Sequence, residues 1–154
     1  MEVLKRIASF SVDHNKITEG IYLSRVDGDV YTYDLRTRVP NAGDYMDNVT
    51  MHSVEHLFAT FVRSSSAGDR VIYFGPMGCR TGFYLLLRDT SGGEALALVK
   101  NVLKKILVYD GPMPGASRVE CGNYLELDLE KGKEECRRYL AVLESRDFDM
   151  SYPA

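Results

Sequence analysis

Two hydrophobic periodicities alternate along this chain of 154 residues, and they limit the folds that it can adopt. Apolar residues recur at helical spacing in three segments, which we expect to be helices: 48–64, 93–109 and 131–145. Shorter segments rich in Val, Ile, Tyr, Phe or Leu indicate strands: 20–25, 29–36, 70–75 and 82–88. The Asp27-Gly28 pair indicates a hairpin between the first two strands. An early hairpin with helices interspersed later favours an α+β fold, a two-layer sandwich with a largely antiparallel sheet packed against helices.

Composition and charge restrict the class of protein further. With 45% hydrophobic and 27% charged residues, the chain is typical of one globular domain, which we expect to span residues 1–154. A net charge of -3 gives no basic surplus for binding a nucleic acid backbone. No apolar run is long enough for a signal peptide or a membrane span, so we expect a cytoplasmic protein without a membrane partner. The odd number of cysteines, three, argues against a disulfide framework.

Some positions in the expected helices have predicted roles. Thr50 or Asn48 is the expected N-cap of the first helix. On the third helix, Cys136 lies in the apolar stripe, and we expect it to be a small buried hydrophobe. Arg137 and Arg138 are expected to face water.

The segment most informative about chemistry is His52-Ser53-Val54-Glu55-His56, within the first expected helix. Residues i and i+4 differ by about 40° around a helix, so both imidazoles can reach one metal ion. Glu55 lies about 60° from His52 on the other side, where its carboxylate can act as an acid or a base. The same H-x-x-E-H pattern occurs in the inverzincin class of zinc proteases. A pair of histidines on the solvated helix face is the alternative.

A metal site that carries out chemistry usually takes three protein ligands and leaves one position open. The third ligand can be His14, Cys121 or a carboxylate. Cys121 follows a loop with two prolines and two glycines, residues 111–115, and its thiolate can turn inward there. A His2Cys site with an open position suits Zn or Fe(II). An ordinary loop thiol is the alternative for Cys121.

A second cysteine, Cys79, stands in a glycine-rich turn between two expected strands. Such a turn presents the thiol at a strand end, where neighbouring Arg80 could help to hold it as a thiolate. A structural turn with an incidental cysteine is equally compatible with the pattern. By pattern alone, His14 is a surface histidine, and Arg36 is a solvated charge or an ion-pair partner.

Taken in order along the chain, these segments resemble one family, the S-ribosylhomocysteine lyases called LuxS. The H-x-x-E-H-L helix, followed at a fixed later place by P-M-G-C-R-T-G-F-Y, is highly specific for that family. The resemblance covers positions 9–122 and rests on five segments: Ser9-Phe10 with Asp13-His14, Asp34-Leu35-Arg36, His52 to Leu57, Pro76 to Tyr84, and Cys121-Gly122.

The resemblance implies an activity and a metal. Members of the family cleave S-ribosylhomocysteine by metal-assisted carbonyl migration along the ribose and β-elimination of the thioether. The products are homocysteine and 4,5-dihydroxy-2,3-pentanedione, the precursor of autoinducer-2. Metal ligands are then expected at His52, His56 and Cys121, with Fe(II) as the native ion and Zn or Co as replacements. The resemblance also implies a homodimer with active sites at the subunit interface.

The resemblance further implies roles for other residues. Cys79 and Glu55 would be the two general acid/base groups. The residues that hold the ribosyl portion and assist proton movement would be Ser9, His14 and Arg36. The chain departs from the family pattern at 37–39, where Thr-Arg-Val replaces Phe-Cys-Gln, and at 73–75, where Tyr-Phe-Gly replaces Asp-Ile-Ser. Both departures affect the expected contacts with the substrate near its homocysteine end.

Two other functions use the same helix. In an inverzincin-like zinc hydrolase, Glu55 would activate a metal-bound water. In a binding module stabilised by metal, a closed site of four ligands would form. Replacing Cys79 with Ala separates the three, since only the lyase should lose turnover while keeping its metal.

Overall fold

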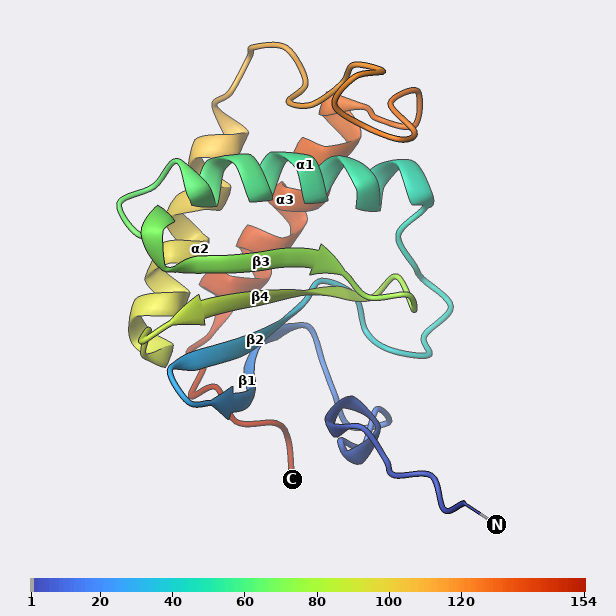
Figure 1. Ribbon diagram of the computed structural model, residues 1–154, viewed down its shortest axis with the longest axis vertical. Coiled ribbons are helices and arrows are strands. Elements are labelled where there is room, and N and C mark those ends of the chain that lie inside the picture. The colour runs from blue at the N-terminus through green and yellow to red at the C-terminus, as the bar shows by residue number, and fades with distance from the viewer. Residues whose placement is uncertain (1) are drawn as a thin grey trace.

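The computed structural model describes residues 2–154 and consists of a sheet layer and a helix layer (Figure 1). The sheet has four strands in the order β1-β2-β4-β3, and each neighbouring pair is antiparallel. The strand bounds are Gly20–Asp27 for β1, Val30–Arg36 for β2, Val71–Pro76 for β3 and Gly82–Arg88 for β4. The expected strands are thus confirmed to within two residues at each end.

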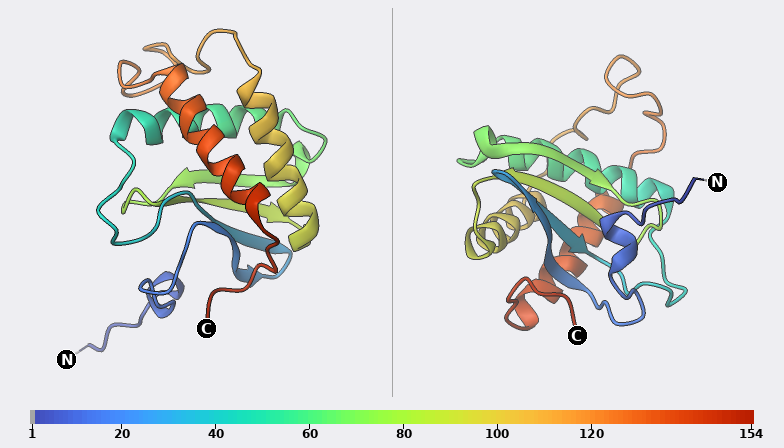
Figure 2. Two further views of the ribbon diagram at one scale, coloured as in Figure 1. Left: turned by 180° about the vertical axis from the view of Figure 1, so that it is seen from behind. Right: turned by 60° about the horizontal axis from the view of Figure 1, so that its bottom comes forward.

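Three long helices cover one face of this sheet, as the view from behind shows (Figure 2). They are α1 (Asn48–Arg63), α2 (Gly92–Leu107) and α3 (Leu129–Ser145), and each contacts the other two. Of two short 3-10 helices, η1 (Ala8–Ser11) precedes β1 and η2 (Gly68–Arg70) lies between α1 and β3. The predicted two-layer α+β arrangement is confirmed.

Local signals explain where these elements begin and turn. Gly28 joins β1 to β2 with a φ of 62°, a left-handed conformation that glycine adopts without strain. Asp47 is the N-cap of α1, since its side chain accepts a hydrogen bond of 2.7 Å from the backbone N–H of Thr50. The expectation of Thr50 or Asn48 as the cap was therefore wrong. Both residues lie inside the helix, because the carboxylate of Asp47, just before Asn48, accepts the hydrogen bond that caps the first turn.

The core lies between the two layers. Leu35 and Leu85 reach it from the sheet, and Phe58 and Leu103 from the helices. Cys136 is 1% exposed in this core, and burial raises the pKa of its thiol to about 12, as expected for a small hydrophobe. Because side chains alternate along a strand, the neighbours of Leu35 on β2 point away from the helices.

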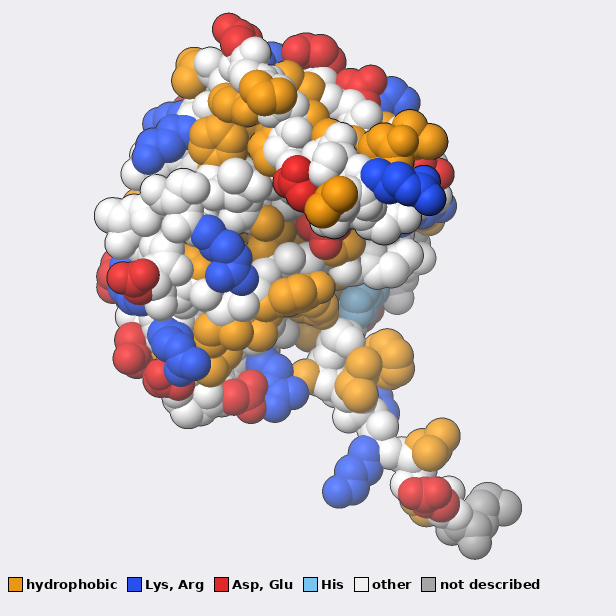
Figure 3. Space-filling model, turned by 45° about the horizontal axis from the view of Figure 1, so that its top comes forward, with side chains coloured by type: hydrophobic (Ala, Val, Ile, Leu, Met, Phe, Trp, Pro, Cys, Tyr) orange, Lys and Arg blue, Asp and Glu red, His pale blue; other side chains and the backbone are white. Residues whose placement is uncertain are grey.

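The N-terminal residues project from the body of the molecule and carry exposed apolar side chains (Figure 3). Val3 and Leu4 are 87% and 86% exposed, and Ile7 and Phe10 are exposed as well. Among the helices of residues 2–154, none is both long enough and apolar enough to cross a membrane.

Candidate active site

One group of candidate site residues lies on the face of α1 that points away from the core. His52 and His56 are one helical turn apart, and their rings meet edge to face with centroids 4.6 Å apart. The sulfur of Cys121, from the loop between α2 and α3, lies 3.4 Å from Nε2 of His52. One ligand atom from each of the three residues lies within 4.8 Å of the other two. The structure therefore brings together the three residues expected to bind a metal.

Backbone carbonyls of the α2–α3 loop orient both imidazoles. Nδ1 of His52 lies 2.9 Å from the carbonyl oxygen of Glu126, and Nδ1 of His56 lies 2.8 Å from that of Pro114. A carbonyl only accepts, so each Nδ1 donates and each Nε2 keeps a lone pair for a metal. Cys121 in turn accepts a hydrogen bond from the backbone N–H of Asn123, at 3.4 Å. The donor set, two imidazole nitrogens and one sulfur, fits a divalent ion such as Zn or Fe(II).

A glycine allows the loop to approach His56 this closely. Gly115 has a φ of 69°, and a Cβ built on it would lie 2.7 Å from Nδ1 of His56. Any side chain at this position would therefore push the imidazole out of place. The Pro/Gly loop, which the sequence marked only as a turn, forms one wall of the metal site.

A second group lies on the other face of the sheet, around Arg36. Its guanidinium is 2% exposed and is bound by both carboxylate oxygens of Asp34, at 3.1 and 2.6 Å. Burial opposes the charge on Arg36, but the neighbouring Asp34 outweighs it, and the pKa of Arg36 lies above its usual value. Of the two possibilities that the sequence left open for Arg36, the structure shows the ion pair. Asp34 was missed as a site residue, although its i, i+2 spacing from Arg36 placed both on one face of a strand.

Cys79 lies next to this pair, in the turn between β3 and β4. Its sulfur is 4.0 Å from Nη1 of Arg36 and 3.0 Å from the hydroxyl of Thr81. Arg36 also donates a hydrogen bond of 2.8 Å to that hydroxyl. The cation beside the thiol is therefore Arg36, and the expectation of Arg80 was wrong. Arg80 instead donates to the carbonyl of Met46, at 3.3 Å.

The expected substrate-binding residues Ser9 and His14 line a narrow hollow with Arg36. His14 is half-buried, and its Nδ1 lies 2.8 Å from the carbonyl oxygen of Val12. Tyr84 lines the same hollow and is paired with Asp34 across the β2–β4 ladder. Burial, and then the charge of Asp34, raise the pKa of Tyr84.

The two groups stay separate within one chain. Glu55 is half-buried on α1, beside the metal-ligand candidates, whereas Cys79 lies in the β3–β4 turn, next to Arg36 of β2. Within residues 2–154, no hydrogen bond or ion pair joins the His52–Cys121 group to the Arg36–Cys79 group. Among residues 2–154, Glu55 and Cys79 therefore belong to two groups without a direct polar contact between them.

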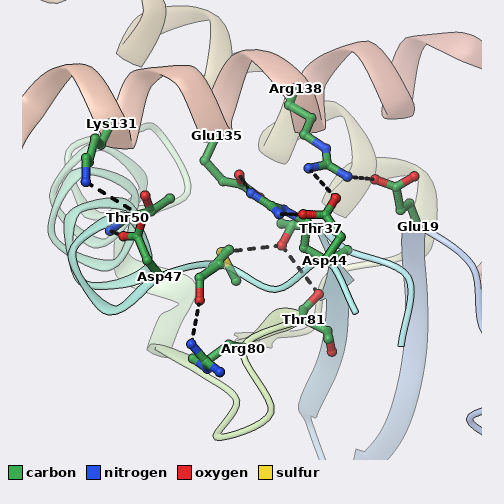
Figure 4. A network of polar contacts seen from close by, with 12 residues as sticks. Glu19, Thr37, Asp44, Asp47, Thr50, Arg80, Thr81, Lys131, Glu135 and Arg138 are labelled. Carbon is green, nitrogen blue, oxygen red and sulfur yellow. Dashed lines mark hydrogen bonds and ion pairs between the residues drawn. The ribbon is translucent and has the colours of Figure 1, made fainter. Parts of the chain in front are cut away.

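The departure at residues 37–39 brings polar contacts with the segment before α1 and with α3 (Figure 4), and none of its residues lines the hollow. Arg38 donates to both carboxylate oxygens of Glu135 on α3, at 2.9 and 2.6 Å, and pairs with Asp44 at 2.7 Å. Asp44 also pairs with Arg138, which is 38% exposed. These ion pairs fasten the segment before α1 to α3. They also show that Arg138 is only partly directed to water.

Known proteins match this chain over nearly all of its length. The family model described as S-Ribosylhomocysteinase (LuxS) matches residues 7–149. An S-ribosylhomocysteine lyase of Desulfotalea psychrophila is 42% identical, with 98% of this chain and 100% of that protein covered. One of Borreliella burgdorferi is 39% identical, with 97% and 100% covered. One of Finegoldia magna is 40% identical, with 97% and 99% covered. The likeness implied by the motifs is confirmed, and the chain belongs to the LuxS family of S-ribosylhomocysteinases.

Proposed function

We propose that this chain is an S-ribosylhomocysteine lyase that uses one divalent metal ion per subunit. The observation that carries this proposal is the cluster of His52, His56 and Cys121 on a chain 42% identical to a lyase of that name. The third member is a thiol from a loop. An inverzincin-like hydrolase would instead need an acidic residue on a following helix, so the cluster favours the lyase over that alternative.

Two imidazole nitrogens and a thiolate bind several divalent ions, so the availability of each metal in the cell decides which one is bound. We propose Fe(II) as the native ion, with Zn or Co as replacements. An ion bound there would polarise the carbonyl oxygen of the opened ribose and make the neighbouring C–H groups acidic. The carbonyl can then be moved from C1 to C2 and on to C3 by proton transfers between carbon and oxygen.

Cys79 and Glu55 are the groups proposed to carry those protons. Nη1 of Arg36 lies 4.0 Å from the Cys79 sulfur, so a cation stands beside the thiol that is proposed to take a proton. Once the carbonyl is at C3, a base takes the proton from C4, the electron pair forms the C4–C5 double bond, and the C5–S bond breaks. The sulfur leaves with the bonding electrons as homocysteine thiolate, so no redox cofactor is needed. Ser9, His14 and Arg36 are proposed to hold the ribosyl portion in the hollow that they line.

We also propose a homodimer in which each active site takes residues from both subunits. Support comes from the separation of the two groups, since one lies on the helix layer and the other on the outer face of the sheet. The exposed Val3, Leu4, Ile7 and Phe10 give the N-terminal segment an apolar surface suited to a second copy. The cytoplasm is the proposed compartment, because Cys79 and Cys121 must stay reduced for these roles.

The proposal is tested with anaerobically purified protein and S-ribosylhomocysteine, following the thiol that is released with a colorimetric disulfide reagent. We expect release from protein loaded with Fe(II) or Co, loss of release after the metal is removed, and recovery when it is restored. No release from metal-loaded protein would contradict the lyase assignment. Hydrolysis of a peptide by the same preparation would favour the inverzincin-like alternative.

A further inference from the structure

The C-terminal tail brings one more side chain to the Arg36 group. Tyr152 is the third residue from the C-terminus, and its hydroxyl donates a hydrogen bond of 2.7 Å to Oδ2 of Asp34. That same oxygen accepts from Nη2 of Arg36, at 2.6 Å. Tyr152 lies beyond residues 7–149, the part of the chain that the family model matches.

The tail is held in place along β1, an edge strand of the sheet. The backbone N–H of Leu23 donates to the carbonyl of Met150, at 2.8 Å, so the tail occupies the free edge of that strand. The Tyr152 ring stacks on Tyr22, with centroids 4.8 Å apart and 16° between the planes. Burial, and then the charge of Asp34, raise the pKa of Tyr152 well above its usual value, so its hydroxyl stays a donor.

A continuous chain of contacts thus runs from the tail to the Cys79 thiol. Asp34 is 1% exposed, so water does not replace a lost donor readily. With Tyr152 and Arg36 both bound, its carboxylate plane is fixed. A fixed carboxylate fixes the guanidinium fork, whose Nη1 lies 4.0 Å from the Cys79 sulfur.

We propose that Tyr152 is a positioning residue of the lyase: its hydroxyl locks Asp34, so that Arg36 stays aligned with the Cys79 thiol. The inference rests on the proposed role of Cys79 in proton transfer. It predicts that Tyr152, which also lines the hollow of Ser9 and His14, influences the reaction through Asp34 and Arg36.

The variant that tests this is Tyr152→Phe, which keeps the stack on Tyr22 and removes only the hydroxyl. A matched control is Tyr33→Phe. The hydroxyl of Tyr33 donates to the carbonyl of Thr90, and its ring lies on the opposite, core-facing side of β2. Both variants lose one phenolic hydrogen bond, part-buried for Tyr152 and buried for Tyr33, but only the first loses a contact with the Arg36 group.

Two readouts are measured on metal-loaded protein: kcat/KM for S-ribosylhomocysteine, and the pH dependence of Cys79 alkylation by iodoacetamide, followed by mass spectrometry of the Cys79 peptide. Among the described residues, Arg36 from β2 and Tyr84 from β4 interact electrostatically with this thiol, and Arg80 follows it in the turn. For Tyr152→Phe we expect kcat/KM to fall about tenfold and the alkylation midpoint to move to higher pH. For Tyr33→Phe we expect only a lower unfolding temperature.

Wild-type values of both readouts in Tyr152→Phe would overturn the proposal, as would equal losses in the two variants. If the wild-type chain has no lyase activity, the proposed function fails, but the alkylation profiles still show whether Tyr152 controls the Cys79 environment. The two failures are therefore distinguishable.

Discussion

Nη1 of Arg36 lies 4.0 Å from the sulfur of Cys79, although 43 positions separate the two residues in the sequence. Nε and Nη2 of the same guanidinium donate to the two carboxylate oxygens of Asp34, so the Arg36 side chain cannot turn freely. A positive charge held beside a thiol favours the thiolate. This relationship links the buried ion pair of β2 to the chemistry proposed for the β3–β4 turn.

The ion pair itself can be tested through stability. Asp34→Asn leaves the Arg36 guanidinium buried without its counter-ion, and we expect the free energy of unfolding to fall by about 3 kcal/mol. Urea unfolding of the metal-loaded protein measures this. The double variant Asp34→Asn/Arg36→Gln should lose less than the sum of the single losses, because the unpaired charge is gone. A loss below about 1 kcal/mol for Asp34→Asn would show that the pair is weakly coupled.

The N-cap of α1 gives a pH-dependent prediction. The hydrogen bond from the backbone N–H of Thr50 lowers the pKa of Asp47 from 3.8. A lowered folded-state pKa adds stability that is present above pH 3.8 and is lost as the pH falls through the folded value. Asp47→Ala should therefore cost about 1 kcal/mol at neutral pH, and the difference from wild type should shrink in acid. Urea unfolding at neutral and acidic pH checks this, and a difference that persists unchanged in strong acid would contradict it.

The wall of the metal site can be tested with Gly115→Ala. The new Cβ would lie 2.7 Å from Nδ1 of His56 and displace the ring from the carbonyl of Pro114. We expect metal affinity to fall about tenfold or more, measured by competition with a chelator. Gly28→Ala is the matched control, since Gly28 has a φ of 62° but no neighbouring atom within 4 Å of its added Cβ. If the two variants bound the metal with equal affinity, the contact of the new Cβ with His56 would not weaken metal binding, and the prediction would be wrong.

The proposed sharing of the active site between subunits predicts complementation. Cys79→Ala and His52→Ala should each be inactive. After subunit exchange, a mixed dimer should hold one site built entirely from unaltered residues. An equal mixture should therefore recover about a quarter of wild-type activity, because half of the dimers are mixed and each has one working site. If both groups acted within one chain, every site would carry a defect, and no activity would return.

Much of the fold could be predicted from the sequence because periodicity reports which face of an element is buried. The strands and helices follow the expected segments, and Cys136 lies in the core as its place in the apolar stripe indicates. Periodicity does not report which polar side chains find partners. Lys133 and Glu135 are 6% and 4% exposed on α3, because Lys133 donates to the carbonyl of Tyr109 and Glu135 binds Arg38.

The sequence likewise predicted some features of the candidate site and missed others. The i, i+4 spacing of His52 and His56 placed both on one helix face, as the structure shows. The cation beside Cys79 could not be found from the sequence, because adjacency suggested Arg80 and only the β2–β4 pairing brings Arg36 near. The tail contact of Tyr152 with Asp34 spans 118 positions and has no local signal.

Proton transfer by Cys79 is tested by comparing Cys79→Ala with the wild-type chain, with metal content and thiol release from S-ribosylhomocysteine measured on the same preparations. We expect equal metal in both, release from the wild type, and almost none from the variant. Wild-type release from metal-loaded Cys79→Ala would contradict this expectation, since the thiol proposed to move the protons would then be dispensable.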